Sequence, residues 1–223
     1  MREQIANIPI CHDYMHLQRI TVSAYTLYQN EKNLPITGEV DPRTIIAAAL
    51  VHSVGKILYD KHLAENQRDF GPQPTDSADK VQYNQHDLLF DFLRDQDCPP
   101  DVAGPASLIA SLVSFTRELM DKGKIQDHCE AYPGLKFVQD ADRLDELGCV
   151  GVARMAANEK KTILEVVDRI DKRLVHYVGL MKTKSGRKEA EKRWARMLEF
   201  REGLLVQTDC SVGLKTEGHH RSV

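Results

Sequence analysis

Apolar residues recur at intervals of three and four along most of the chain, and this spacing constrains the fold more than any other feature. Such spacing places apolar side chains on one face of an α-helix, whereas a half-buried strand needs strict alternation. Alternation over more than a few residues is hard to find in this sequence. The pattern therefore predicts an all-α fold, a helical bundle in a single domain.

The segment IIAAALV, residues 45–51, is the most apolar part of this pattern. Because it is apolar on all sides, it is typical of a central helix that is buried on every face. Asp41 and Pro42 stand just before it, and this residue pair favours a helix start. We therefore expect a buried helix that begins after Asp41 and ends at His52.

The same periodicity predicts further helices on both sides of this one, and their ranges are given below with the domain limits.

A polar stretch with one Gly and two Pro, residues 66–78, is typical of an exposed loop that could cap a pocket. With 223 residues the chain can bury one full core. We predict one domain over residues 1–208 and a flexible tail over 209–223. The other predicted helices cover about 11–30, 77–94, 102–121, 135–158, 164–181 and 186–205.

Composition and charge exclude several classes of partner. A net charge of −3, from 30 basic and 33 acidic residues, provides no basic field for nucleic acid or an anionic membrane. No apolar run approaches the roughly 18 residues that span a bilayer, and the N-terminus lacks the apolar core of a signal peptide. The five cysteines are widely spaced without a C-x-x-C pair, so neither disulfides nor a thiolate zinc site is indicated. We expect a cytoplasmic protein that acts on a small-molecule substrate, with its oligomeric state left open.

Three polar residues fall where the pattern predicts burial. His16 shares a helix face with Ile20, His52 ends the apolar helix, and Asp140 lies beside an apolar stripe. A buried polar group needs a partner, and a single inward histidine is usually a hydrogen-bonded core residue. Two imidazoles and a carboxylate from three helices are also a reasonable ligand set for Mn, Fe, Co, Ni or Zn. The residues alone leave both interpretations open.

Three segments resemble the motifs of the HD-domain superfamily of metal-dependent phosphohydrolases, in particular its small single-domain branch. These segments are HDYMHLQRI (12–20), AALVHSVGK (48–56) and KFVQDADRLDELGCVGVARM (136–155), and the resemblance extends over about 8–207. It implies the helical HD-domain fold. It also implies metal ligands at His16, His52 and Asp140.

The chain departs from the family pattern at the centre of the expected site. The family's fourth ligand is an aspartate directly after the central histidine, where this chain has Ser53. Lys56, Leu58 and Val113 replace an aspartate, a lysine and a histidine that are common in the branch. A neutral serine oxygen is a poor ligand, so we expect a divalent ion (Mn, Fe, Co, Ni, Zn or Mg) to be held weakly or not at all.

Other residues near these motifs are candidates for catalysis or substrate binding. A cation at position 56 would attract phosphate, and the arginines could balance the charge of a substrate. Pairing with acidic neighbours is an equal alternative for the arginines. Asp142 and Asp145 fall on other helix faces than Asp140, and for them a solvated helix surface or a bond to Arg143 or Arg154 is the simpler expectation. The predicted catalytic residues are Lys56 and Asp145, and the predicted substrate-binding residues are His12, Asp13, Arg19, Ser53 and Arg143.

Three functions fit this set of residues. The first is hydrolysis of a small phosphorylated metabolite, nucleotide-like, at a weakened metal site. The second is a metal-independent lyase, hydratase, cyclase or isomerase, with His16, His52 and Asp140 as general acids or bases. The third is a catalytically inactive binding protein that keeps the fold.

Overall fold

The computed structural model describes residues 14–35, 39–55, 57–61, 78–120, 122–158, 162–209 and 211. Helices dominate these ranges, which contain no strand, so the all-α prediction is confirmed. None of the described helices is long and apolar enough to cross a membrane. The helices are α2 (Tyr14–Glu31), α3 (Pro42–Val51), α5 (Ala78–Asp95), α6 (Pro100–Ser111), α7 (Phe115–Met120), α8 (Lys122–Ala131), α9 (Gly134–Glu146), α10 (Cys149–Asn158), α11 (Ile163–Lys172), η3 (Leu174–His176), α12 (Tyr177–Leu180) and α13 (Lys184–Thr208).

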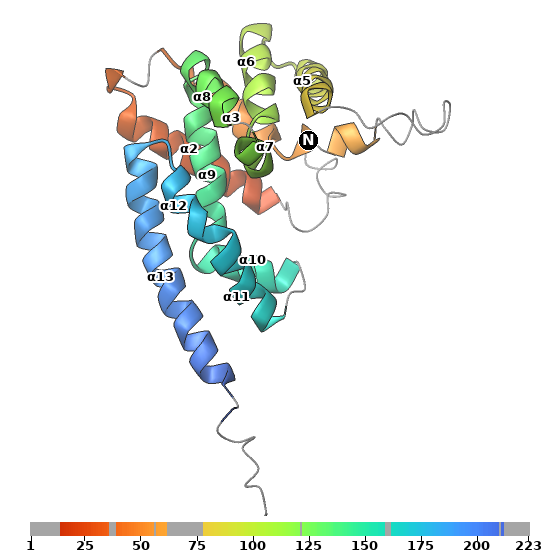
Figure 1. Cartoon of the computed structure of the whole chain (residues 1–223). Coiled ribbons are helices and arrows are strands. Elements are labelled where there is room, and N and C mark those ends of the chain that lie inside the picture. The colour runs from red at the N-terminus through yellow and green to blue at the C-terminus, as the bar shows by residue number, and fades with distance from the viewer. Residues whose placement is uncertain are drawn as a thin grey trace, which may run out of the picture.

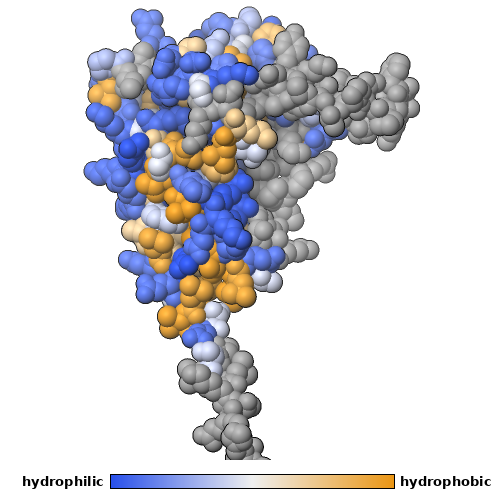
Figure 2. Space-filling view, in the orientation of Figure 1, coloured by the Kyte–Doolittle hydropathy of each residue, from blue (hydrophilic) through white to orange (hydrophobic). Residues whose placement is uncertain are grey.

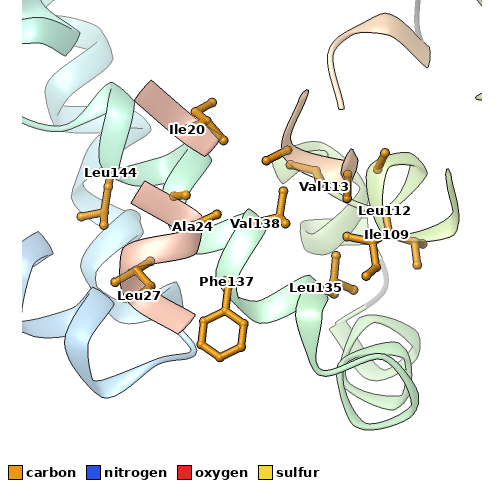
Figure 3. Packing of buried hydrophobic residues seen from close by; sticks show 14 of the residues in the cluster. Ile20, Ala24, Leu27, Ile109, Leu112, Val113, Leu135, Phe137, Val138 and Leu144 are labelled. Atoms are coloured by element: carbon orange, nitrogen blue, oxygen red, sulfur yellow. The ribbon is translucent and has the colours of Figure 1, made fainter. Parts of the chain in front are cut away.

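Helix α9 is the element around which the others pack. It contacts α2, α3, α6 and α13, and Figure 1 shows it running through the middle of the molecule. Figure 3 shows apolar side chains of α2 on one side of α9 and of α6 on the other. Every residue labelled there is buried, so α9 carries the centre of the hydrophobic core.

Helix α3 forms as its sequence predicts. Asp41 caps it, because its carboxylate accepts a hydrogen bond from the backbone N–H of Arg43 at 2.8 Å, and Pro42 occupies the first turn. Ile45, Ala48, Ala49 and Val51 are buried against α2, α6 and α9, whereas Ile46, Ala47 and Leu50 are only partly buried, so the helix is not buried on every face as expected. His52 forms the C-cap, so the histidine stands where the buried helix ends.

Several predicted helices are divided in the structure. Leu112 to Ser114 separate α6 from α7, and Leu147 and Gly148 separate α9 from α10. Gly148 has φ +83°, a conformation that glycine adopts without the steric cost of a Cβ. The region 164–181 forms α11, η3 and α12, and α8 was not predicted. Residues 66–77 of the predicted loop, and residues 210 and 212–223 of the predicted tail, lie outside the described residues.

One face of the molecule carries exposed apolar side chains. Figure 2 shows them as a band over the lower half of the view, where Figure 1 places α11, α12 and α13. The exposed large apolar side chains of α11, η3 and α13, counted over every face, are Ile163, Leu164, Val175, Leu198, Phe200 and Val206.

Candidate metal centre

Two histidines and one aspartate from three helices converge on one point. His16 comes from α2, His52 from the end of α3 and Asp142 from α9, and one ligand atom of each lies within 4.8 Å of the other two. The two imidazole rings are 5.4 Å apart between centroids. The side chain of His16 is 2% exposed and that of Asp142 is 23% exposed, so the cluster is buried on one side and accessible at the carboxylate.

The hydrogen bond of His16 determines which of its ring nitrogens faces the cluster. Its Nδ1 lies 2.8 Å from Oδ2 of Asp145. An ionised carboxylate accepts hydrogen bonds and donates none, so Nδ1 carries the proton. In the neutral imidazole the lone pair is then on Nε2, which lies 3.9 Å from Oδ1 of Asp142.

The same reasoning applies to His52. Its Nδ1 lies 2.8 Å from the backbone carbonyl oxygen of Ala49, which can accept but not donate a hydrogen bond. The lone pair of the neutral ring is therefore on Nε2, 3.6 Å from Oδ1 of Asp142. The hydroxyl of Ser53 lies 2.9 Å from the same nitrogen. Both imidazoles thus direct Nε2 toward one carboxylate.

Asp145 fixes the His16 ring through Nδ1, the nitrogen on the side away from the cluster. It is 6% exposed, and it accepts hydrogen bonds from Arg19 Nε at 2.6 Å and from Arg154 Nη1 at 2.6 Å. Burial alone would raise the pKa of Asp145, but the bonds from His16 and Arg19 and the charge of Arg154 outweigh it and hold that pKa well below its usual range. The carboxylate therefore stays ionised and fixes the orientation of the imidazole. The alternative pairing of Asp145 with Arg154 is confirmed.

Asp140 does not join the cluster, which corrects its predicted place beside the two histidines. Its carboxylate accepts hydrogen bonds from the backbone N–H groups of Lys182 at 3.0 Å and Thr183 at 2.8 Å, and from the Thr183 hydroxyl at 2.7 Å. Burial raises its pKa, and these bonds act in the opposite direction. Asp140 thus holds the start of α13, and the carboxylate beside the histidines belongs to Asp142, two residues further along α9.

Arg143 is buried as well, which corrects its predicted substrate-binding role. Its side chain is 1% exposed, and its guanidinium forms an ion pair with Glu118 of α7. Glu118 also binds Lys182 Nζ at 2.6 Å, and burial lowers the pKa of Arg143 to about 10. Arg19, by contrast, is 31% exposed, although its guanidinium is bound to Asp145.

The structure does not describe three of the predicted site residues. His12, Asp13 and Lys56 lie outside the described residues. Two further positions at which the chain departs from the family pattern are part of the apolar packing, since Val113 is buried and Leu58 packs against the core.

A signal for Asp142 was present in the sequence. Residues three apart share a helix face, so Asp142 and Asp145 had to lie together, while Asp140 had to point away. The apolar stripe indicated that Asp140 is buried, but burial does not identify the partner. A carboxylate that caps a distant helix is as well satisfied as one that binds a metal.

The three residues form a suitable ligand set for a divalent ion. Two imidazole nitrogens and one carboxylate oxygen suit ions such as Zn, Fe, Co, Ni or Mn better than Mg, which prefers oxygen ligands. The two Nδ1–H groups donate hydrogen bonds to Asp145 and to the Ala49 carbonyl, which orients the rings from outside, an arrangement that is typical of histidines in metal sites. Three protein ligands would leave positions for water or substrate.

Comparisons with known proteins were made at the level of sequence and of structure. No protein-family model matches the chain, and no curated protein matches its sequence. Solved structures do match over nearly the whole length. Bacillus subtilis YpgQ in complex with ADP aligns with a TM-score of 0.62 and 22% identity, over 94% of this chain and 96% of that one.

Two other solved structures give the same result. A protein of Lactobacillus plantarum aligns with a TM-score of 0.63 and 20% identity, over 92% of each chain. An HD-superfamily hydrolase from Bacillus thuringiensis aligns with a TM-score of 0.54 and 22% identity, over 88% of this chain and 86% of that one. Likeness at this level of identity identifies the architecture. The chain therefore has the HD-domain fold.

Proposed function

We propose that this chain hydrolyses small phosphorylated metabolites, nucleotides in particular, with a divalent ion held by His16, His52 and Asp142. One observation carries the proposal. Each imidazole is fixed by a hydrogen bond at Nδ1, so that Nε2 of both rings lies within 4 Å of the Asp142 carboxylate. Two ring nitrogens and a carboxylate oxygen that converge on one point are placed to bind a divalent cation in common.

The residues of this chain would each have a defined part in the reaction. His16, His52 and Asp142 would hold the ion, and Asp145 would keep His16 in its ligating tautomer. A bound divalent ion supplies a Lewis acid for phosphoryl oxygens and lowers the pKa of water. Lys56, four residues after His52 in the sequence, would attract the negative charge of the substrate.

Two observations favour a nucleotide substrate: the charge of the ligand set and the ADP complex of one protein with the same fold. YpgQ, which shares the fold, has been crystallised with ADP. A phosphate substrate also suits a ligand set with one carboxylate, because a dication with a single anionic ligand keeps net positive charge. Nucleoside phosphates are accordingly the first compounds to test.

Phosphate release from a panel of nucleoside mono-, di- and triphosphates tests the proposal. The full chain is stripped with a chelator and then supplied with Mn, Fe, Co, Ni, Zn or Mg in turn. We expect release that depends on added metal and falls at least about 10-fold in Asp142→Asn. Asp127→Asn, which alters an exposed carboxylate on α8, is the matched control and should not change the rate. Failure of every ion to support turnover would refute the proposal.

A second function is favoured by one specific contact. The Ser53 hydroxyl already binds His52 Nε2, so the imidazole has a proton donor where a metal would otherwise bind. An imidazole and a carboxylate in a buried cluster can also serve as general base and acid without a metal. Turnover of a small organic substrate that persists in excess EDTA would support this alternative and count against the first.

A further inference from the structure

We infer that Ser53 is an internal competitor for the metal, because its hydroxyl occupies the His52 lone pair that the ion needs. The inference rests on the metal centre of the proposed function but not on the reaction carried out there. Its basis is a pair of hydrogen bonds made by the His52 ring. Nδ1 lies 2.8 Å from the Ala49 carbonyl oxygen, and Nε2 lies 2.9 Å from the Ser53 hydroxyl. In the family pattern this position is an aspartate that ligates the metal, so a serine that opposes metal binding reverses the role of the position.

The direction of the second hydrogen bond follows from the first. A backbone carbonyl can only accept, so His52 Nδ1 must donate to Ala49. The neutral ring then has no proton on Nε2, and the hydrogen between Nε2 and Ser53 Oγ must come from the serine. An imidazole nitrogen has a single lone pair in the plane of the ring. It cannot accept a hydrogen bond and coordinate a cation at the same time.

The position of Ser53 makes the competition effective. Ser53 directly follows His52 at the end of α3, is 9% exposed, and lies between the buried residues Val51 and Val54. The ion must break this hydrogen bond to coordinate His52, and the cost of doing so subtracts from the affinity for the metal.

Whether Ser53 competes with the metal or binds it decides the direction in which Ser53→Ala changes the metal affinity. If Ser53 were a weak ligand in place of the family's aspartate, then Ser53→Ala would lower the affinity for metal. If Ser53 competes for His52, the same change should raise the affinity by about 2- to 10-fold, the equivalent of one net hydrogen bond. Ser53→Thr keeps a hydroxyl at this position and should leave the affinity close to that of the wild type.

Calorimetric titration of the metal-free full chain with Co²⁺ or Zn²⁺ alone measures this directly. The variants are Ser53→Ala, Ser53→Thr, Ser53→Asp and His52→Ala, each first shown by circular dichroism to be folded. We expect the affinity to rise in Ser53→Ala, to stay unchanged in Ser53→Thr, and to fall by at least about 10-fold in His52→Ala. Ser53→Asp should also bind more tightly than the wild type, because it adds a charged ligand.

The outcomes separate this inference from the proposed function. Unchanged or weaker binding in Ser53→Ala, with normal binding in the wild type, would overturn the inference and leave the metal centre intact. If no protein bound the ion, Ser53→Asp included, both the inference and the proposed function would be overturned. A second measurement needs no metal: nitrogen chemical shifts of His52 should report a protonated Nδ1 and a hydrogen-bonded Nε2, and the Nε2 shift should change in Ser53→Ala. The reverse tautomer would contradict the inference.

Discussion

Asp140 and Asp142 show how two identical side chains, two residues apart, can have unrelated roles. On a helix with 3.6 residues per turn they point in nearly opposite directions. Asp140 reaches the start of α13, and Asp142 reaches the two histidines. Removal of each charge should therefore affect a different property of the protein.

A pair of matched substitutions tests this division. Asp142→Asn should lower the affinity for Co²⁺ or Zn²⁺ by at least about 10-fold with little change in the free energy of unfolding. Asp140→Asn should leave the metal affinity near that of the wild type and lower the free energy of unfolding by about 1–3 kcal/mol, since a buried set of hydrogen bonds is weakened. Calorimetric titration and urea unfolding measure the two quantities. The opposite assignment of the two effects would show that Asp140 is the ligand.

Asp145 acts on the metal through His16. Without its negative charge the bond that fixes the His16 tautomer would weaken, and Arg19 and Arg154 would lose their common anionic acceptor. We expect Asp145→Asn to reduce metal affinity by about 10- to 100-fold, the usual cost of losing a partner of a ligating histidine. Glu189→Gln, which alters a carboxylate that pairs with Arg193 on α13, is a control that should not change the affinity. Equal metal affinity in Asp145→Asn and the wild type would show that this support is dispensable.

At the scale of secondary structure, helix α13 is anchored at its first turn by carboxylates from two other helices. Asp140 of α9 binds the N–H groups of Lys182 and Thr183, and Glu31 of α2 binds the N–H and hydroxyl of Ser185 at 2.6 Å and 2.7 Å. Negative charge at a helix N-terminus is also favoured by the helix dipole. The anchor joins α13 to the same two helices that carry Asp142 and His16.

Thr183 is the N-cap of α13, and its loss should loosen this anchor. Its hydroxyl donates to Asp140 at 2.7 Å and accepts from the N–H of Gly186 at 3.0 Å. We expect Thr183→Ala to lower the free energy of unfolding by about 0.5–2 kcal/mol and to speed amide hydrogen exchange in the first turn of α13. Thr162→Ala removes the N-cap of α11 and should move the faster exchange to that helix instead. Unchanged exchange at the start of α13 would contradict the role of Thr183.

At the scale of the whole molecule, the sequence predicted the architecture better than the site. The all-α fold and the position of α3 followed from local signals, namely apolar spacing and the Asp41 cap. The division between α9 and α10 did not, because apolar periodicity continues on both sides of Gly148. His16 and His52 were identified by their apolar surroundings, and the structure brings them together.

The choice between Asp140 and Asp142 depended on contacts that are distant in sequence. Asp140 binds residues 42 and 43 positions further along the chain, and Asp145 binds His16 across 129 positions. Local periodicity can show that a carboxylate is buried, but only the packing of α2, α9 and α13 decides what it meets. The role of Ser53 is a similar case, because its contact with His52 depends on which nitrogen of the ring binds Ala49.

Anomalous diffraction from crystals grown with Zn²⁺ tests the central claim, a metal centre at His16, His52 and Asp142, most directly. Data collected at the zinc absorption edge should give a peak about 2.0–2.2 Å from Nε2 of both histidines and from a carboxylate oxygen of Asp142. The peak should be lost in crystals of Asp142→Asn. A zinc peak elsewhere, with none between these three side chains, would contradict the account.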